Sequence, residues 1–203
     1  MKMWQITEPG CVKLATGKET CEEGFVKVRL QRCAICSLDM DLFTGIESAP
    51  YPFVPTRLGV GVVSEVGCGE GGAPERGRRV VIEPYIRLRD GKPLIMGKNT
   101  DGLLRDFASV PAENAHPLPD QVDDDEAVFV DATGIALRAL NKLNVQKGEH
   151  IAIIGASVIG IIMAELAIYY QAVPILVDAR QDMLDIAAAS GVYYTVNTSE
   201  TDA

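Results

Sequence analysis

The chain has 203 residues, 47% of them hydrophobic, so it is long enough to bury a core in one large domain or two small ones. Its formal net charge is −9, and its lysines and arginines form no block. Nucleic acid is therefore not an expected partner, because a phosphate backbone is bound by clustered cations.

Residues 1–120 are predicted to form a β-rich first domain. Short β-branched runs recur at residues 25–30 (FVKVRL), 61–66 (GVVSEV) and 79–82 (RVVI). Turn signals separate the runs, such as residues 8–10 (EPG) and 68–72 (CGEGG). This pattern is typical of a compact antiparallel barrel or sandwich.

Residues 121–203 are predicted to form a second domain, in which strands and helices alternate. Four acids at residues 123–126 open a helical stretch that reaches about Leu143, and acids in a first turn favour the helix dipole. The sequence then predicts a strand at 150–155, a helix at 158–171, a strand at 174–178, a helix at 181–189 and a strand at 192–196. Such alternation indicates a parallel sheet with right-handed crossovers.

A glycine-rich turn, GASVIG at residues 155–160, follows the first of these strands, and Asp178 ends the second. Strand, tight turn, helix, strand and acid in this order describe a dinucleotide pocket. The turn and the positive end of the helix approach the pyrophosphate, and the acid accepts the ribose hydroxyls. The candidate cofactor-binding residues are Gly155, Ser157, Val158, Ile159, Gly160, Asp178 and Arg180.

The turn departs from the pattern G-x-G-x-x-G at its middle glycine, which is Ser157. That glycine lets the backbone come close to the pyrophosphate, so we expect weaker binding, or a serine hydroxyl that donates to phosphate.

Asp178 predicts NAD rather than NADP, because a carboxylate repels a 2′-phosphate. Arg180 either offers that phosphate a cation or is a solvated residue at a helix start, and we favour the second alternative.

Residues 151–170 are almost wholly apolar, and about 20 such residues can span a bilayer. Three small residues at 155–157 interrupt the run and Glu165 lies within it, so a buried strand and helix are predicted and no membrane span.

The five cysteines, at positions 11, 21, 33, 36 and 68, do not have the spacing of a disulfide framework, and residues 1–6 lack a signal-peptide core. A cytoplasmic location is therefore expected.

Several segments resemble the medium-chain dehydrogenase/reductase family, in its zinc alcohol dehydrogenase group. Residues 33–41 (CAICSLDMD) resemble the family's first zinc-ligand loop, C-G-I-C-G-T-D-x-H, and residues 61–67 (GVVSEVG) its G-V-V-x-E-V-G strand. Residues 101–102 (DG), 110–114 (VPAEN) and 116–119 (HPLP) are similar to the end of its first domain. The resemblance implies an α/β fold with a β-rich domain: a GroES-like barrel followed by a partial Rossmann doubly wound parallel sheet.

The resemblance also identifies what replaces the family's catalytic zinc ligands. Cys36 matches the first ligand, Arg57 stands at the histidine of a G-H-E motif, and the third ligand position falls at Asp131. An arginine keeps its proton in a protein and cannot bind zinc, so no metal site is predicted. Arg57 and Asp131 either form an ion pair, which would avoid an uncompensated buried carboxylate, or are both solvated at a cleft mouth.

The family's proton relay is altered as well. Its hydroxyl residue corresponds to Leu38, which has no exchangeable proton, and its histidine corresponds to Asp41. Asp39 either orients the loop by accepting hydrogen bonds from backbone amides or is a plain turn residue. The candidate catalytic residues are Cys36, Asp41, Arg57 and Asp131, with Arg57 as the cation for a developing oxyanion.

Only one β-α-β-α-β half of a doubly wound sheet is present, so we expect a fragment of a longer protein, with a shortened natural gene as the alternative. Two functions stay open. One is a zinc-independent, NAD-dependent oxidoreductase that transfers a hydride on a small alcohol, carbonyl or activated alkene. The other is a degenerate member that binds a nucleotide or a protein partner without catalysis. A homo-oligomer is an open assembly state.

Overall fold

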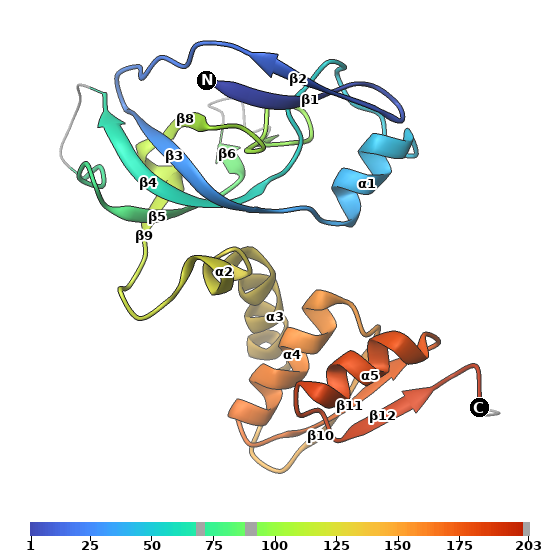
Figure 1. Ribbon diagram of the computed structural model, residues 1–203. Helices are drawn as coiled ribbons and strands as arrows, with labels where there is room; N and C mark the ends of the chain where they lie inside the picture. Colours follow the sequence, from blue (N-terminus) through green and yellow to red (C-terminus); the bar gives the residue numbers. More distant parts are fainter. Residues whose placement is uncertain (68–71, 88–92, 201–203) are drawn as a thin grey trace. The chain divides into compact units, whose positions relative to one another are not determined.

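The computed structural model describes residues 1–67, 72–87 and 93–200 and divides the chain into two compact units, Met1–Phe129 and Val130–Ala203 (Figure 1). The predicted turn at residues 68–72 lies almost wholly outside the described residues. Each unit buries a hydrophobic cluster of its own, so the two are described separately.

The first unit is built on a five-stranded antiparallel sheet with the strand order β8-β3-β4-β5-β9. Its strands are β3 (Phe25–Ala34), β4 (Leu58–Val66), β5 (Arg79–Ile82), β8 (Phe107–Pro111) and β9 (Ala115–Pro117). The pairing of β3 with β4 shifts register between Lys27 and Val28 and again between Leu30 and Arg32. Such irregularities bend and twist a strand, and both strands are long curved ribbons in Figure 1.

The predicted strands at residues 25–30, 61–66 and 79–82 all lie in this sheet. Alternate residues of a strand face the same side, and those that face inward here are apolar and buried: Val26, Val28, Val63, Val80 and Ile82. Shorter elements complete the unit: β1 (Lys2–Glu8), β2 (Cys11–Thr16), α1 (Ser37–Thr44), β6 (Tyr85–Arg87), β7 (Pro93–Ile95), a 3-10 turn (Ala112–Asn114) and α2 (Asp124–Ala127).

The acidic stretch from residue 123 forms two helices, α2 and α3 (Val130–Leu143), where the sequence predicted one continuous stretch. Asp123 caps α2, and its carboxylate accepts a hydrogen bond of 2.7 Å from the amide of Glu126. Ala127 is buried with the barrel strands, whereas Leu140 of α3 is buried in the second unit. The helix is interrupted because its two parts bury their apolar residues in different cores.

The second unit confirms the predicted alternation of strands and helices. A parallel sheet with the order β10-β11-β12 contains β10 (His150–Ile154), β11 (Val173–Asp178) and β12 (Tyr194–Asn197). The connecting helices are α4 (Val158–Tyr169) and α5 (Gln181–Ala189). Residues of both helices are buried with Ile153 and Leu176 in one cluster, so both helices cover the same face of the sheet.

The opposite face of this sheet carries apolar side chains at the surface. Ile154, Val177 and Val196 pair in register across the three strands, and Ile154 is 88% exposed. Successive side chains of a strand point to opposite faces of the sheet. One face is therefore buried and the other exposed, although the strands are apolar throughout.

Two glycines allow α4 to begin directly at the end of β10. Gly155 has a φ of +106°, a backbone conformation that side chains with a Cβ rarely adopt. A Cβ at Gly160 would collide with the carbonyl oxygen of Gly155. The first turn of the helix is thus packed against the backbone of the glycine-rich turn.

In the first unit, the buried carboxylate of Asp39 joins two loops. Asp39 is 5% exposed, and its Oδ2 accepts a hydrogen bond of 2.8 Å from the amide of Cys36. Its Oδ1 accepts one of 2.8 Å from the amide of Thr56, 17 residues away. The prediction that Asp39 orients the Cys36 loop is confirmed, and the loop is tied to residue 56 by the same side chain.

Replacing Asp39 with asparagine should destabilise the first unit by about 1–3 kcal/mol, because an amide nitrogen would then face a buried backbone donor. Asp41→Asn removes the same charge from a less buried position on α1 and should cost under about 0.5 kcal/mol. Urea unfolding of the two variants compares these values. Equal losses of unfolding free energy would show that the two amide contacts of Asp39 contribute nothing.

Replacing Gly160 with alanine should destabilise the second unit by about 1–3 kcal/mol, because the added methyl group overpacks the turn. Gly134 lies in α3 with open space at its Cβ position, so Gly134→Ala should stabilise by up to about 1 kcal/mol through helix propensity. Thermal unfolding followed by circular dichroism measures both changes. A neutral Gly160→Ala variant would contradict the packing described above.

Candidate functional site

Asp178 connects the glycine-rich turn to the loop that follows β11. Its Oδ2 accepts a hydrogen bond of 2.7 Å from the amide of Ala156, and its Oδ1 accepts one of 2.8 Å from the amide of Arg180. The hydrogen bonds from Arg180 and Ala156 lower the pKa of Asp178, so this carboxylate is charged at neutral pH. The structure thereby brings Asp178 to the predicted turn, although 22 residues separate it from Ala156.

Ser157 occupies the N-cap position of α4. Its backbone is extended, with a φ of −70°, and its Oγ accepts a hydrogen bond from the amide of Gly160 at 3.4 Å. Because φ is negative here, the middle position of the turn does not need a glycine for its backbone conformation. The serine oxygen acts as acceptor in this bond, so its hydroxyl hydrogen can still be donated to another group.

Val158 and Ile159 form the start of the first turn of α4. The first amides of a helix point outward from its N-terminus and carry partial positive charge. They form a group of backbone donors beside the carboxylate of Asp178, whereas the amide of Gly155 already donates to the carbonyl oxygen of Val177 at 2.8 Å. Each carboxylate oxygen has a second lone pair, so Asp178 can accept hydroxyl groups as well as the two amides. The residues present therefore fit the adenosine diphosphate part of a dinucleotide.

The guanidinium of Arg180 is held by Asp182. Nη2 of Arg180 lies 2.6 Å from Oδ2 of Asp182, and Nε lies 3.2 Å from Oδ1. Both side chains are largely exposed, and Arg180 itself is the N-cap residue of α5. The position at a helix start is as expected, but the side chain is in a two-bond ion pair that the sequence analysis did not foresee. A carboxylate two residues away was the available signal.

In the first unit, Cys36 is the N-cap residue of α1, and Arg57 lies close enough to act on it electrostatically. Burial and the hydrogen bond with Asp39 raise the pKa of the Cys36 thiol, whereas the charge of Arg57 lowers it. Burial also raises the pKa of Cys33 to about 11, and its thiol donates to the carbonyl of Leu103 at 3.1 Å. Both thiols are therefore protonated at neutral pH and are poor nucleophiles.

Thr56 is a residue of this site that the sequence analysis missed. It is fully buried, has a φ of +75°, and its amide donates to Asp39. Threonine rarely adopts a positive φ, and the first position of the G-H-E pattern, where a glycine is expected, was the signal. The neighbouring contacts of Asp39 hold this conformation in place.

The remaining predicted residues of the first unit are dispersed. Leu38 packs with the buried cluster of Ile6, Leu42 and Phe53, consistent with its lack of an exchangeable proton. Asp41 lies on α1, two residues beyond Asp39. Asp131 lies in the first turn of α3, in the other unit, so its predicted ion pair with Arg57 stays a prediction.

The donor set around Cys36 does not fit a catalytic zinc ion. Zinc needs ligands with a lone pair, and Arg57, which the sequence analysis places at the histidine position, has none to give. Within residues 1–67, 72–87 and 93–200, no three histidine, cysteine, aspartate or glutamate side chains are grouped so as to hold a metal ion.

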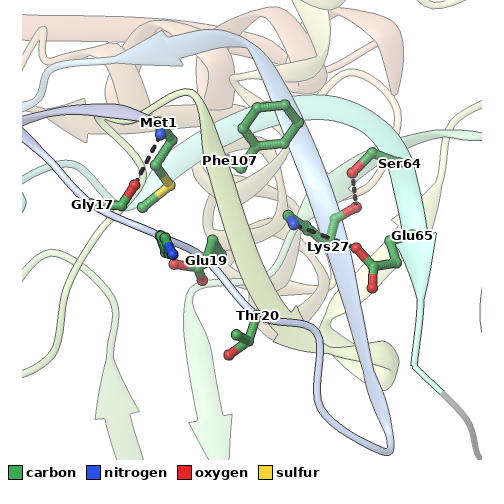
Figure 2. Close-up of a pocket in the computed structure, with 9 residues that line it drawn as sticks. Met1, Gly17, Glu19, Thr20, Lys27, Ser64, Glu65 and Phe107 are labelled. Atoms are coloured by element: carbon green, nitrogen blue, oxygen red, sulfur yellow. Dashed lines mark hydrogen bonds and ion pairs between the residues drawn. The ribbon is translucent and has the colours of Figure 1, made fainter.

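A cavity of about 460 Å³ lies in the first unit, and Figure 2 shows its lining. Lys27 lies 3.3 Å from the carboxylate of Glu65 and 5.7 Å from the ring centroid of Phe107. The ammonium of Met1 donates to the carbonyl of Gly17, as the dashed line in Figure 2 indicates. The lining contains none of the predicted site residues, and these cations already have partners.

No helix in the part of the chain that the structure describes has the length and apolar character needed to cross a membrane. The apolar run at residues 151–170 forms β10 and α4, as predicted.

Comparison with known proteins agrees with this architecture. Residues 22–120 match the family model of the alcohol dehydrogenase GroES-like domain. An uncharacterized zinc-type alcohol dehydrogenase-like protein of Haemophilus influenzae is 30% identical over 190 residues, which are 87% of this chain and 56% of that protein.

Solved structures agree over almost the whole chain. An E. coli CFT073 alcohol dehydrogenase, RspB, complexed with NADH, has a TM-score of 0.89 at 26% identity and is matched over 99% of this chain and 63% of its own. A Sinorhizobium meliloti 1021 protein bound to NADP has a TM-score of 0.89 at 22% identity, with 99% and 63% covered.

The chain thus spans less than two thirds of the length of these relatives. It has an α/β fold in which a GroES-like β-rich part precedes part of a Rossmann sheet, as the sequence predicted. The matched domain, the relative and the structural likeness lead to one conclusion: the chain belongs to the zinc-type alcohol dehydrogenase-like group of the medium-chain dehydrogenase/reductase family.

Proposed function

We propose that the second unit binds NAD through its adenosine diphosphate part. We further propose that the protein to which this chain belongs is an oxidoreductase that acts on a small-molecule alcohol, carbonyl or activated alkene without zinc. The observation that carries the proposal is the position of Asp178. Its carboxylate lies beside the amides of the glycine-rich turn, so one site offers donors to a pyrophosphate and an acceptor to the ribose.

The turn and α4 would hold the two phosphates. The side-chain-free Gly155 lets the ligand approach the backbone, and the amides of Val158 and Ile159 face the approaching anion. The hydroxyl of Ser157 would donate to a phosphate oxygen while its oxygen continues to cap the helix. This dual use favours the second of the two expectations for Ser157.

Asp178 would bind the ribose through the lone pairs that the backbone amides leave open. Because the pKa of Asp178 is lowered, the carboxylate keeps its charge at neutral and mildly acidic pH and remains an acceptor. That charge would also repel the phosphate on the 2′ position of NADP. The complex of RspB with NADH supports the choice of a nicotinamide dinucleotide.

The bound nicotinamide would supply or accept the hydride. In carbonyl reduction, negative charge develops on the substrate oxygen and needs a cation or a hydrogen-bond donor until water protonates it. Arg57 stands at the position of a zinc ligand, carries a permanent charge and acts electrostatically on the Cys36 site. We propose that its guanidinium stabilises this oxygen in place of a metal.

A cytoplasmic location and the assembly state remain predictions from the sequence. A degenerate member that binds only a protein partner would not bind the cofactor, and titration with NADH separates this alternative from the oxidoreductase.

Titration of the 203-residue chain with NADH, followed by cofactor fluorescence, should show saturable binding below millimolar concentration. Asp178→Asn should weaken that binding about tenfold or more, because hydrogen bonds to a charged acceptor contribute about 1.5–3 kcal/mol each. Asp185→Asn removes the same charge from the same unit at a side chain that bonds Gln181, and should change binding less than about twofold.

Absence of NADH binding at millimolar concentration would favour the degenerate member over an oxidoreductase. Equal weakening by the two variants would mean that Asp178 acts only through net charge. Circular dichroism of each variant separates loss of binding from loss of folding.

Protein purified without chelators should contain well below one equivalent of zinc per chain, because Arg57 stands at a ligand position and has no lone pair to give. Elemental analysis measures the metal content. One tightly bound equivalent that is lost in a Cys36→Ser variant would overturn the zinc-independent chemistry while leaving the cofactor site intact.

A further inference from the structure

NAD and NADP differ at the edge of the site that Asp178 and Arg180 form. The 2′-phosphate of NADP adds about two negative charges and is usually received by an arginine near the end of this strand. In this chain, Arg180 follows Asp178 by two residues, and its amide already bonds the Asp178 carboxylate. Its guanidinium is therefore the cation best placed in the sequence to receive such a phosphate.

The structure directs that guanidinium to Asp182 instead. The two hydrogen bonds, 2.6 Å and 3.2 Å long, occupy the Nη2 and Nε edge of Arg180, the same planar edge that binds a phosphate. Asp182 stands in the first turn of α5, where a carboxylate is also favoured by the helix dipole. The carboxylate and the 2′-phosphate would thus compete for one edge of Arg180.

The charges near this edge add to the effect. Asp182 bonds the guanidinium of Arg180 and Asp178 bonds its backbone amide, so two carboxylates lie close to one cation. The 2′-phosphate of NADP would therefore be repelled by a net negative charge. The 2′-hydroxyl of NAD is uncharged and would not be repelled.

We propose that Asp182 is a specificity-determining residue that holds Arg180 away from the 2′ position and restricts the site to NAD. The proposal rests on the function proposed above. Asp182 does not touch the cofactor in this arrangement; it acts through Arg180. Proteins of this fold include one bound to NADH and one bound to NADP, so the choice between the cofactors must be made by local side chains of this kind.

The ion pair is largely exposed, and an exposed pair contributes little to stability, so removing Asp182 should leave the fold intact. The same exposure makes the switch easy to operate, since the released guanidinium can turn toward the ribose without rearrangement of the backbone. A single substitution should therefore change cofactor preference.

The experiment measures dissociation constants of NADH and NADPH for the 203-residue chain and its Asp182→Asn, Arg180→Gln and doubly substituted variants. Asp182→Asn should shift the preference toward NADPH by about fivefold or more, the scale of one exposed charge pair. Asp185→Asn is the matched control, because it removes the same charge from the same helix. It should shift the preference by less than about twofold.

The double-substitution cycle tests whether Arg180 carries the effect. Arg180→Gln should weaken NADPH binding more in the Asp182→Asn background than in the native one, because only there is the guanidinium released. An equal NADPH-over-NADH preference in Asp182→Asn and Asp185→Asn would overturn this inference. So would a gain in NADPH binding by Asp182→Asn that persists when Arg180 is also replaced. If the native chain binds NADH and the preference does not move, the proposed function stands and only the inference fails. If no form binds either cofactor, both fail.

Discussion

The second unit of this protein depends on one close contact, between the backbone of Gly160 and the carbonyl oxygen of Gly155. Without a Cβ at either residue, α4 begins where β10 ends, and its first amides lie next to the turn. The same geometry directs the amide of Ala156 toward Asp178, on the neighbouring strand. Helix amides and a carboxylate thus lie side by side because of a single packing constraint, since the parallel strands end at a common edge.

The first unit uses a buried carboxylate for a comparable purpose. Asp39 binds the amides of Cys36 and Thr56, so two loops from different parts of the barrel sheet are fixed relative to each other. Such a carboxylate stabilises the loops whether or not a metal is bound.

The order of elements could be predicted because it depends on local patterns. Apolar runs, turn residues and the acid at the end of a strand gave the five elements between residues 150 and 197 to within two residues at every end. The continuous helix predicted from residue 123 was wrong in one respect, since helix propensity does not reveal that Ala127 and Leu140 belong to different cores. Thr56 was missed because threonine rarely adopts a positive φ, and the signal for it was its place at the glycine of the G-H-E pattern.

The sequence by itself determined the family, the order of strands and helices, and the glycine spacing of the turn. These features are set by residue type and short-range spacing. Only the tertiary structure decided that Asp39 reaches Thr56 and that Asp178 reaches Ala156. Side-chain partners are chosen by which loops the folded chain brings within about 3 Å, and that proximity is not encoded in any short segment.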